Sequence, residues 1–237
     1  MITPEIQFGL HLIKRIRKKI LPVYGLKQLD VPIGKISKDF SYAVDNAAEE
    51  EIKKSFSTLW EQGIYYGYIT EDQGLVFPPN HAVSHMFLID PVDGSRGATA
   101  GTEQACITMA ITPGQKDKPT FADLTYGITH AIKENVTFIG KRGEGVYHIN
   151  KDGASHTVTK REHPPTELHQ VAMVIEDYQI RWKYLGEVVD SLRAELHCDT
   201  VFNSGAYGGL SLIRGQNGLQ VDIRRKLIAD FPNLAIA

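Results

Sequence analysis

The sequence predicts an α+β fold in which helices and sheets form separate layers. Apolar residues recur at helical spacing through the first 65 residues, whereas short apolar runs separated by turn residues dominate the middle of the chain. This segregation is typical of an α+β arrangement and not of a strict alternation of strand and helix. One apolar run, residues 86–89, leads into the stretch of greatest chemical interest, which reads Asp90-Pro91-Val92-Asp93-Gly94-Ser95.

The composition is that of an ordinary globular protein. The chain has 237 residues, of which 42% are hydrophobic and 23% charged, and we expect a single domain over residues 1–237 because no repeat or long linker divides it. The net charge of −2 favours neither nucleic acid nor a membrane as a partner. Two cysteines, Cys106 and Cys198, are too few for a disulfide framework. No stretch has the length of a membrane span or the pattern of a signal peptide, so we expect a cytoplasmic location.

Two helices open the chain. The first is predicted over residues 3–22, with a start signal at Thr3-Pro4-Glu5. The second is predicted to begin at Asp45, a residue type that caps helices, and to stop at Gly63. The basic residues of the first helix are interpreted as a solvated outer face rather than a membrane-binding patch; they are Lys14, Arg15, Arg17, Lys18 and Lys19.

Two successive strands are predicted to end in acidic residues. Residues 65–70 form a strand that delivers Glu71 to its end, followed by Asp72. Residues 86–89 form a buried strand that delivers Asp90 and then Asp93. In open sheets that carry helices, ligands gather at the carboxyl ends of the strands, so these carboxylates are candidate site residues.

The residues after this strand suit an anion. Pro91 and Gly94 are expected to turn the chain as it leaves the sheet. If Gly94 and Ser95 open a short helix, its free N–H groups and positive dipole end suit a phosphate. Two acids would repel that phosphate unless cations lie between them. Oxygen-only ligands select hard ions, so the pattern indicates Mg²⁺ or Mn²⁺.

Two plainer interpretations stay open at this stage. Asp, Pro and Gly are the commonest turn residues, so residues 90–94 also have the composition of an ordinary turn. His81 and His85 are four residues apart and invite a zinc site. No helix is predicted there, however, and no third nitrogen or sulfur ligand is near in the sequence.

Further short elements follow. Strands are predicted over residues 105–111, 124–132, 136–140, 145–149, 171–175 and 221–224. Helices are predicted over residues 178–196 and from Ser204-Gly205-Ala206 to Arg214, and Asp230 stands at one more helix-entry signal.

Taken in order, these features resemble the inositol monophosphatase family, the lithium-sensitive, metal-dependent phosphatases that include archaeal fructose-1,6-bisphosphatases and nucleotide 3′-phosphatases. The ordered set is an Asp that opens the second helix, a Glu-acid pair, D-P-x-D-G-[ST], a glycine-rich segment at residues 140–145, a Ser-Gly-Ala helix entry and a late Asp. The resemblance covers nearly the whole chain and looks closest to archaeal members. It implies a layered α/β sandwich of sheets and helix pairs.

The resemblance also implies metal ligands. Glu71, Asp90 and the Val92 carbonyl would hold one Mg²⁺, and Asp90, Asp93 and Asp230 would hold a second. Two or three ions are implied, with Mn²⁺ as an alternative. Two such ions stabilise both the attacking water and the leaving alkoxide of a phosphate ester.

Catalytic and substrate contacts are implied in the same way. Ser95, together with Glu71 or Asp45, would orient and deprotonate the attacking water. The residues implied to contact the substrate are Gly94, Ser95, Asp93, Ala206 and Asp222.

The implied activity is hydrolysis of a small polyol or sugar phosphomonoester, similar to inositol monophosphate, by a homodimer. The alternatives are a fructose-1,6-bisphosphatase, a nucleotide 3′-phosphatase, or a catalytically silent binding protein. Three departures from the family pattern are Ser95 in place of Thr, Asp72 in place of Glu, and the residues around Asp230 in place of W-D-x-A-[AG]. Family members also continue past the position of Ala237, so the C-terminal part of the family fold is expected to be missing.

Overall fold

The computed structural model describes residues 2–25, 43–102, 104–158, 172–176, 187, 190–191, 194–195, 199–203, 205–214 and 219–221. Several predictions fall outside these residues. Most of the helix expected over 178–196 does, as do Asp222, Asp230 and the end of the strand expected over 221–224.

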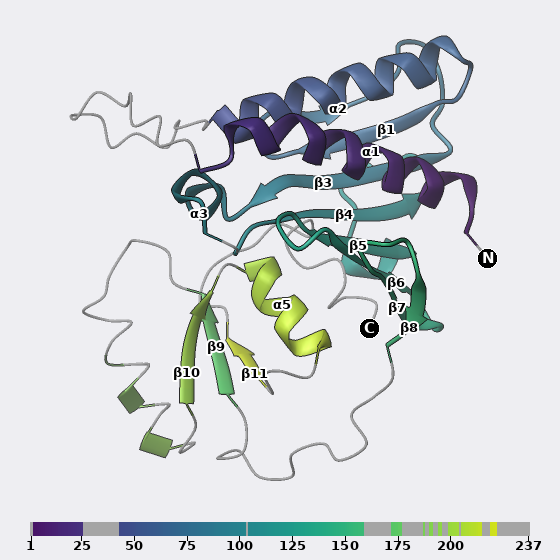
Figure 1. The fold of residues 1–237 in the computed structure, drawn as a ribbon. Coiled ribbons are helices and arrows are strands. Elements are labelled where there is room, and N and C mark those ends of the chain that lie inside the picture. Colours follow the sequence, from purple (N-terminus) through teal and green to yellow (C-terminus); the bar gives the residue numbers. More distant parts are fainter. Residues whose placement is uncertain are drawn as a thin grey trace.

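Two antiparallel helices cover one face of a large sheet (Figure 1). Helix α1 spans Pro4–Ile20 and continues into a 3₁₀ turn, η1, at Leu21–Val23; helix α2 spans Ala43–Glu61. Both predicted helices are confirmed. The start of the second was wrong, because Asp45 lies in the first turn of α2 and does not precede it. The side chain of Asp45 therefore projects from the first turn of α2 and does not act as the N-cap.

The large sheet has eight strands in the order β2-β1-β3-β4-β5-β6-β7-β8. Strands β1 and β3 are parallel, and every other neighbouring pair is antiparallel. The predicted strands of this region are confirmed, and β2 and β8 are additional. The bounds are β1 Tyr66–Thr70, β2 Gly74–Val76, β3 His85–Asp93, β4 Cys106–Pro113, β5 Tyr126–Ala131, β6 Val136–Lys141, β7 Gly145–Ile149 and β8 Ser155–Thr157.

The main core lies between the helix pair and this sheet. Ile16 of α1, Phe56 of α2, and Phe87 and Met109 of the sheet are fully buried there. The helix approaches the sheet closely at Gly9, where a Cβ would lie 3.0 Å from the sulfur of Met109. The apolar faces of the two helices thus pack against the continuous apolar runs of the central strands.

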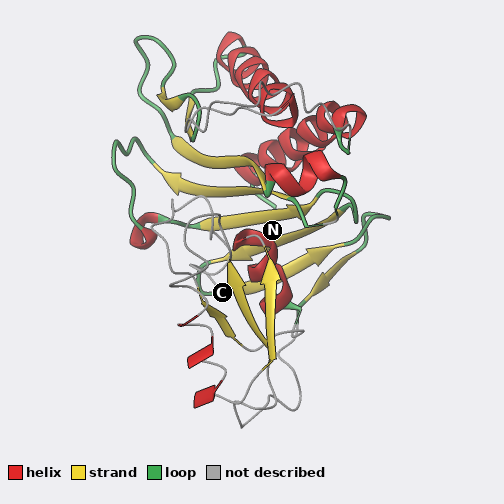
Figure 2. Ribbon diagram, turned by 90° about the vertical axis from the view of Figure 1, so that its left-hand side faces the viewer, coloured by secondary structure: helices red, strands yellow, loops and turns green. Residues whose placement is uncertain are grey.

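A smaller sheet forms the other side of the molecule. Its three parallel strands follow the order β10-β9-β11, with β9 at Ala172–Glu176, β10 at Asp199–Asn203 and β11 at Leu219–Val221. Helix α5, Gly205–Ile213, contacts β9 and β11 on one side and β3, β4 and β5 on the other. Figure 2 shows the helix pair and the small sheet on opposite sides of the large sheet. The predicted α+β layering is confirmed.

No helix in the described part of the chain is long and apolar enough to cross a membrane.

Candidate active site

The predicted acidic residues lie at one edge of the large sheet, where two parallel strands end. Strands β1 and β3 are in register with Ile69 opposite Leu88. Glu71 follows directly after β1, and Asp90 lies two residues beyond Leu88 in β3. Glu71 is exposed in the turn after β1, whereas Asp90 is partly buried in β3. The structure therefore places these two predicted ligands on neighbouring strand ends.

Strand β3 does not end where the sequence predicted. It runs on through Pro91 to Asp93, and its pairing with β4 shifts register between Asp90 and Asp93. Proline has no N–H to contribute to the ladder, and a bulge at this position removes the need for one. The Val92 N–H instead donates to Oδ1 of Asp90, at 3.1 Å. The turn that was expected at Pro91 occurs only at Gly94.

Asp93 is buried rather than surface-facing, with 7% of its surface exposed. Its Oδ2 accepts a hydrogen bond from the Ala206 N–H at 3.0 Å and lies 3.8 Å from the sulfur of Cys106. This contact brings the start of α5, where Ala206 lies, against the end of β3. A carboxylate has room for further donors or a cation beyond these two contacts.

Gly94 turns the chain, as the sequence predicted, and helix α3, Ser95–Ala100, follows it. Its φ of 86° is in the left-handed region that favours glycine. The Ser95 hydroxyl lies 2.7 Å from Oδ1 of Asp45 and 2.8 Å from the Val92 carbonyl oxygen. Helix α2 thus presents Asp45 to Ser95 across 50 residues of sequence.

The donor chemistry at this edge suits a hard cation, because carboxylate and carbonyl oxygens are the ligands that Mg²⁺ and Mn²⁺ prefer. Within the described ranges, however, no three Asp, Glu, His or Cys side chains form a group that could hold a metal ion. The predicted ligands Glu71, Asp90 and Asp93 therefore lie along the same edge without converging as a set.

Sequence reasoning missed Glu49 and Gln73. Glu49 lies one turn after Asp45 in α2 and is 8% exposed, and its carboxylate accepts a hydrogen bond from the Gln73 amide. Burial raises the pKa of Glu49, as do the charges of Asp72 and Asp45, while Thr70 and Gln73 oppose the rise. The four-residue spacing from Asp45 was the available signal, because it puts both carboxylates on one face of a helix.

The two histidines considered as zinc ligands pack against aromatic rings. The His81 ring stacks on Tyr65 at a centroid distance of 3.8 Å, and the His85 ring meets the edge of Tyr66 at 5.6 Å. These contacts account for both side chains without a metal.

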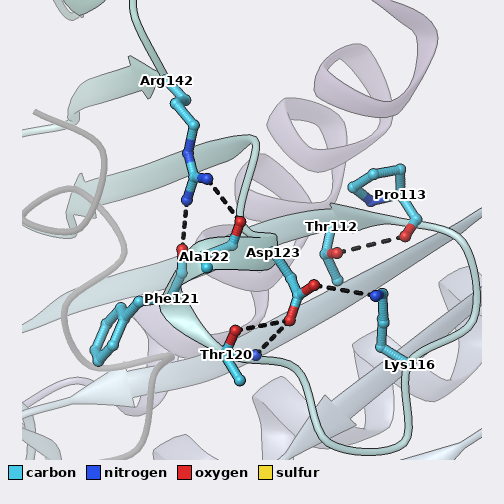
Figure 3. Close-up of polar contacts among 8 residues, drawn as sticks. All are labelled: Thr112, Pro113, Lys116, Thr120, Phe121, Ala122, Asp123 and Arg142. Atoms are coloured by element: carbon cyan, nitrogen blue, oxygen red, sulfur yellow. Dashed lines mark hydrogen bonds and ion pairs between the residues drawn. The ribbon is translucent and has the colours of Figure 1, made fainter.

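The opposite end of the sheet is held by a different polar cluster (Figure 3). The connection between β4 and β5 contains a 3₁₀ turn, η2, at Phe121–Asp123, which Thr120 and Asp123 cap reciprocally. Asp123 also pairs with Lys116 at 3.0 Å, and the Arg142 guanidinium donates to the main-chain oxygens of this turn. The polar groups drawn there bind one another, so the cluster fixes a loop.

Comparison with solved structures identifies the fold of this chain. The sequence matches no family model and no curated protein. Its structure is similar to an inositol monophosphatase from Thermotoga maritima, with a TM-score of 0.72 and 17% identity, over 99% of this chain and 82% of that one. It is also similar to the extragenic suppressor protein SuhB from Bartonella henselae, with a TM-score of 0.73 and 15% identity, over 99% and 84% of the two chains.

A third solved structure extends the comparison. An inositol monophosphatase-fructose 1,6-bisphosphatase aligns with a TM-score of 0.69 and 18% identity, over 97% of this chain and 81% of that one. At such identities the likeness shows the fold. The fold implied by the sequence resemblance is therefore confirmed.

Proposed function

We propose that this protein is a metal-dependent phosphomonoesterase that acts on a small polyol or sugar phosphate. The observation that carries the proposal is the 2.7 Å contact between the Ser95 hydroxyl and Asp45, located beside Asp90 and Asp93. A hydroxyl bonded to a carboxylate, next to further carboxylates at a strand end, suits proton abstraction from a water near a bound cation. The shared fold with inositol monophosphatases adds support.

The chain's own residues would perform the proton transfer. The Ser95 oxygen accepts a hydrogen bond from the attacking water, while its own proton is directed at Oδ1 of Asp45. As the water oxygen bonds to phosphorus, Ser95 takes the water's proton and passes its own to Asp45. The ester bond to the alcohol then breaks, and the alkoxide that leaves is protonated from solvent. The N–H groups of Gly94 and Ser95 would hold the phosphate.

On the family resemblance, magnesium would be held by Glu71, Asp90, the Val92 carbonyl, Asp93 and Asp230; the first four lie along one edge of the sheet and would have to close around the ion. When bound there, it supplies the positive charge that offsets the roughly two negative charges of a phosphomonoester and stabilises the leaving oxygen. We propose Mg²⁺ as the metal and Mn²⁺ as a substitute.

A panel of esters tests the proposal. Phosphate release is measured from inositol monophosphate, fructose 1,6-bisphosphate and a nucleotide 3′-phosphate, each with Mg²⁺, with Mn²⁺, with EDTA, and with added Li⁺. We expect release from at least one ester that requires the metal. If no ester is hydrolysed under any condition, the chain is not a phosphomonoesterase, and the silent binding protein becomes the better interpretation. Light scattering on the same sample tests the expected homodimer.

A further inference from the structure

Glu49 and Gln73 join helix α2 to the turn that follows strand β1. The side-chain amide of Gln73 donates to Oε2 of Glu49 and, at 3.3 Å, to the main-chain oxygen of the same residue. The two residues are 24 positions apart in the sequence. One side chain of the turn therefore holds both the side chain and the backbone of a single position on the helix.

The other groups of Gln73 are also engaged. Its Oε1 accepts a hydrogen bond from the Tyr68 hydroxyl at 2.9 Å, and its backbone N–H donates to the Thr70 hydroxyl at 3.1 Å. Gln73 thus connects the strand before the turn, the turn itself and the helix. Because all the polar groups of its side chain are used, small displacements of residues 71–74 break several hydrogen bonds at once.

This connection lowers the stability of the fold more than an apolar contact at the same place would. Glu49 is 8% exposed, and its Oε1 is buried without a hydrogen-bond partner among the described residues. A buried carboxylate that is only partly satisfied costs stability, and apolar residues of similar volume would hold the helix to the sheet without that cost. The geometry at this position therefore favours a role in placing other groups.

Two residues of the candidate site lie close in sequence to the two ends of this connection. Asp45 lies on the same face of α2, one turn before Glu49, and Glu71 lies two residues before Gln73. Asp45 reaches Ser95, while Glu71 is exposed in the turn that also contains Gln73.

We propose that Glu49 and Gln73 are positioning residues that fix the turn bearing Glu71 relative to the helix face bearing Asp45. The inference rests on the proposed phosphatase function, in which Asp45 takes up the proton of the attacking water through Ser95 and Glu71 would hold the metal. Neither Glu49 nor Gln73 touches the reacting atoms.

Exchanging the two side chains tests the inference. Gln73→Glu places two carboxylates against each other, Glu49→Gln places two amides there, and the double variant Glu49→Gln/Gln73→Glu restores one amide and one carboxylate in reversed order. Gln73→Ala removes the contacts without adding charge. Gln62→Ala, an exposed glutamine beyond the end of α2, is the matched control.

We expect Gln73→Glu and Gln73→Ala to lower kcat by about tenfold or more while KM for the ester changes by less than about threefold, since misplacement of groups acts on the chemical step. The double variant should recover most of the kcat lost in Gln73→Glu, and Gln62→Ala should match the wild type. Retention of kcat in Gln73→Glu and Gln73→Ala, even with a lower melting temperature, would overturn the inference. So would a double variant as slow as Gln73→Glu.

Hydrogen exchange separates this inference from the proposed function. The backbone amides of residues 72–76 should exchange slowly in the wild type, faster in Gln73→Ala, and slowly again in the double variant. This readout needs no substrate. If the wild type hydrolyses no ester, the proposed function fails, and the exchange result alone decides whether the pair fixes the turn; unchanged exchange in Gln73→Ala overturns it.

Discussion

Ser95 is the residue at which helix α2 and strand β3 meet chemically. Its hydroxyl is within hydrogen-bond distance of Asp45 from the helix and of the Val92 carbonyl from the strand. A hydroxyl with two acceptors can donate to only one at a time, so its proton can move between them. Removing the hydroxyl leaves both acceptors in place but takes away the group that is able to relay a proton.

We expect Ser95→Ala to reduce kcat by about 100-fold or more, the usual range for loss of a proton-transfer group. Ser95→Thr should keep most of the activity, because threonine retains the hydroxyl and restricts its rotamer. Ser155→Ala, on the exposed strand β8, is the control. Phosphate release at saturating ester measures the effect. Full activity in Ser95→Ala would remove Ser95 from the mechanism.

His130 predicts a specific pH dependence of stability. It is buried in β5, and its Nδ1 lies 2.9 Å from the Thr137 hydroxyl. Burial lowers its pKa to about 3, with smaller contributions from the charges of Arg17 and Lys14. The unfolded chain, with a pKa near 6.5, takes up this proton as the pH falls and the folded chain does not. The contribution of neutral His130 to the free energy of unfolding is therefore fully present above about pH 6.5 and is lost progressively toward pH 3.

The expected loss at pH 5 is about 2 kcal/mol, at about 1.4 kcal/mol per unit below 6.5. Urea unfolding of the wild type and of His130→Gln at pH 7 and pH 5 measures it. The difference between the free energies of unfolding at pH 7 and pH 5 should be smaller in His130→Gln than in the wild type by this amount. The exposed His11 provides the control His11→Gln, which should behave as the wild type. Equal pH dependence in all three proteins would contradict the buried neutral state of His130.

At the scale of elements, the basic face of α1 is largely solvated, as predicted, and two of its residues also attach the helix to its neighbours. The sequence predicted that its five basic residues form a solvated face. Lys14, Lys18 and Lys19 are exposed as expected. Arg15, however, pairs with buried Glu51 of α2 at 2.6 Å, and Arg17 donates to the Ile132 oxygen at 2.7 Å. Two of the five therefore attach the helix to its neighbours.

We expect Arg15→Ala to lower the free energy of unfolding by about 1–2 kcal/mol. Removing one partner of a buried pair leaves a buried charge uncompensated, and the half-exposed position of Arg15 moderates the loss. Lys18→Ala, an exposed position on the same helix, should change it by less than about 0.5 kcal/mol. Urea unfolding at pH 7 compares the two. Equal stability of both variants would show that the pair of Arg15 with Glu51 does not stabilise the fold.

At the scale of the whole molecule, α5 connects the two sheets. Its beginning donates to Asp93 through Ala206, and its end is held by Glu134, in the turn between β5 and β6. The Arg214 guanidinium makes two bonds to that carboxylate, at 2.6 and 3.2 Å, and Tyr207 donates a third. One helix therefore sets how the small sheet faces the candidate site.

We expect Arg214→Ala to lower the free energy of unfolding by about 1–2 kcal/mol, because a two-pronged charged hydrogen bond is lost at a partly buried position. Exposed Lys151, in the turn after β7, provides the control Lys151→Ala. Hydrogen exchange should also quicken in β9 and β11 of Arg214→Ala before the large sheet is affected. Uniform exchange across both sheets would argue against α5 as the connection between them.

Most helices and strands, and the carboxylates at the ends of β1 and β3, were predictable from local sequence pattern alone. Hydrophobic periodicity and turn-forming residues depend only on near neighbours in the sequence. The first helix, the strand that leads into Asp90 and the turn at Gly94 were therefore all predictable. Local pattern did not show that β3 continues through Pro91, because a bulge depends on the neighbouring strand. Nor did it choose between Glu71 and Asp45 as the partner of Ser95, or reveal buried Glu49. Those outcomes depend on how α2 packs across the sheet, which brings together residues that are far apart in the chain, and such distances are fixed only when the whole core is assembled.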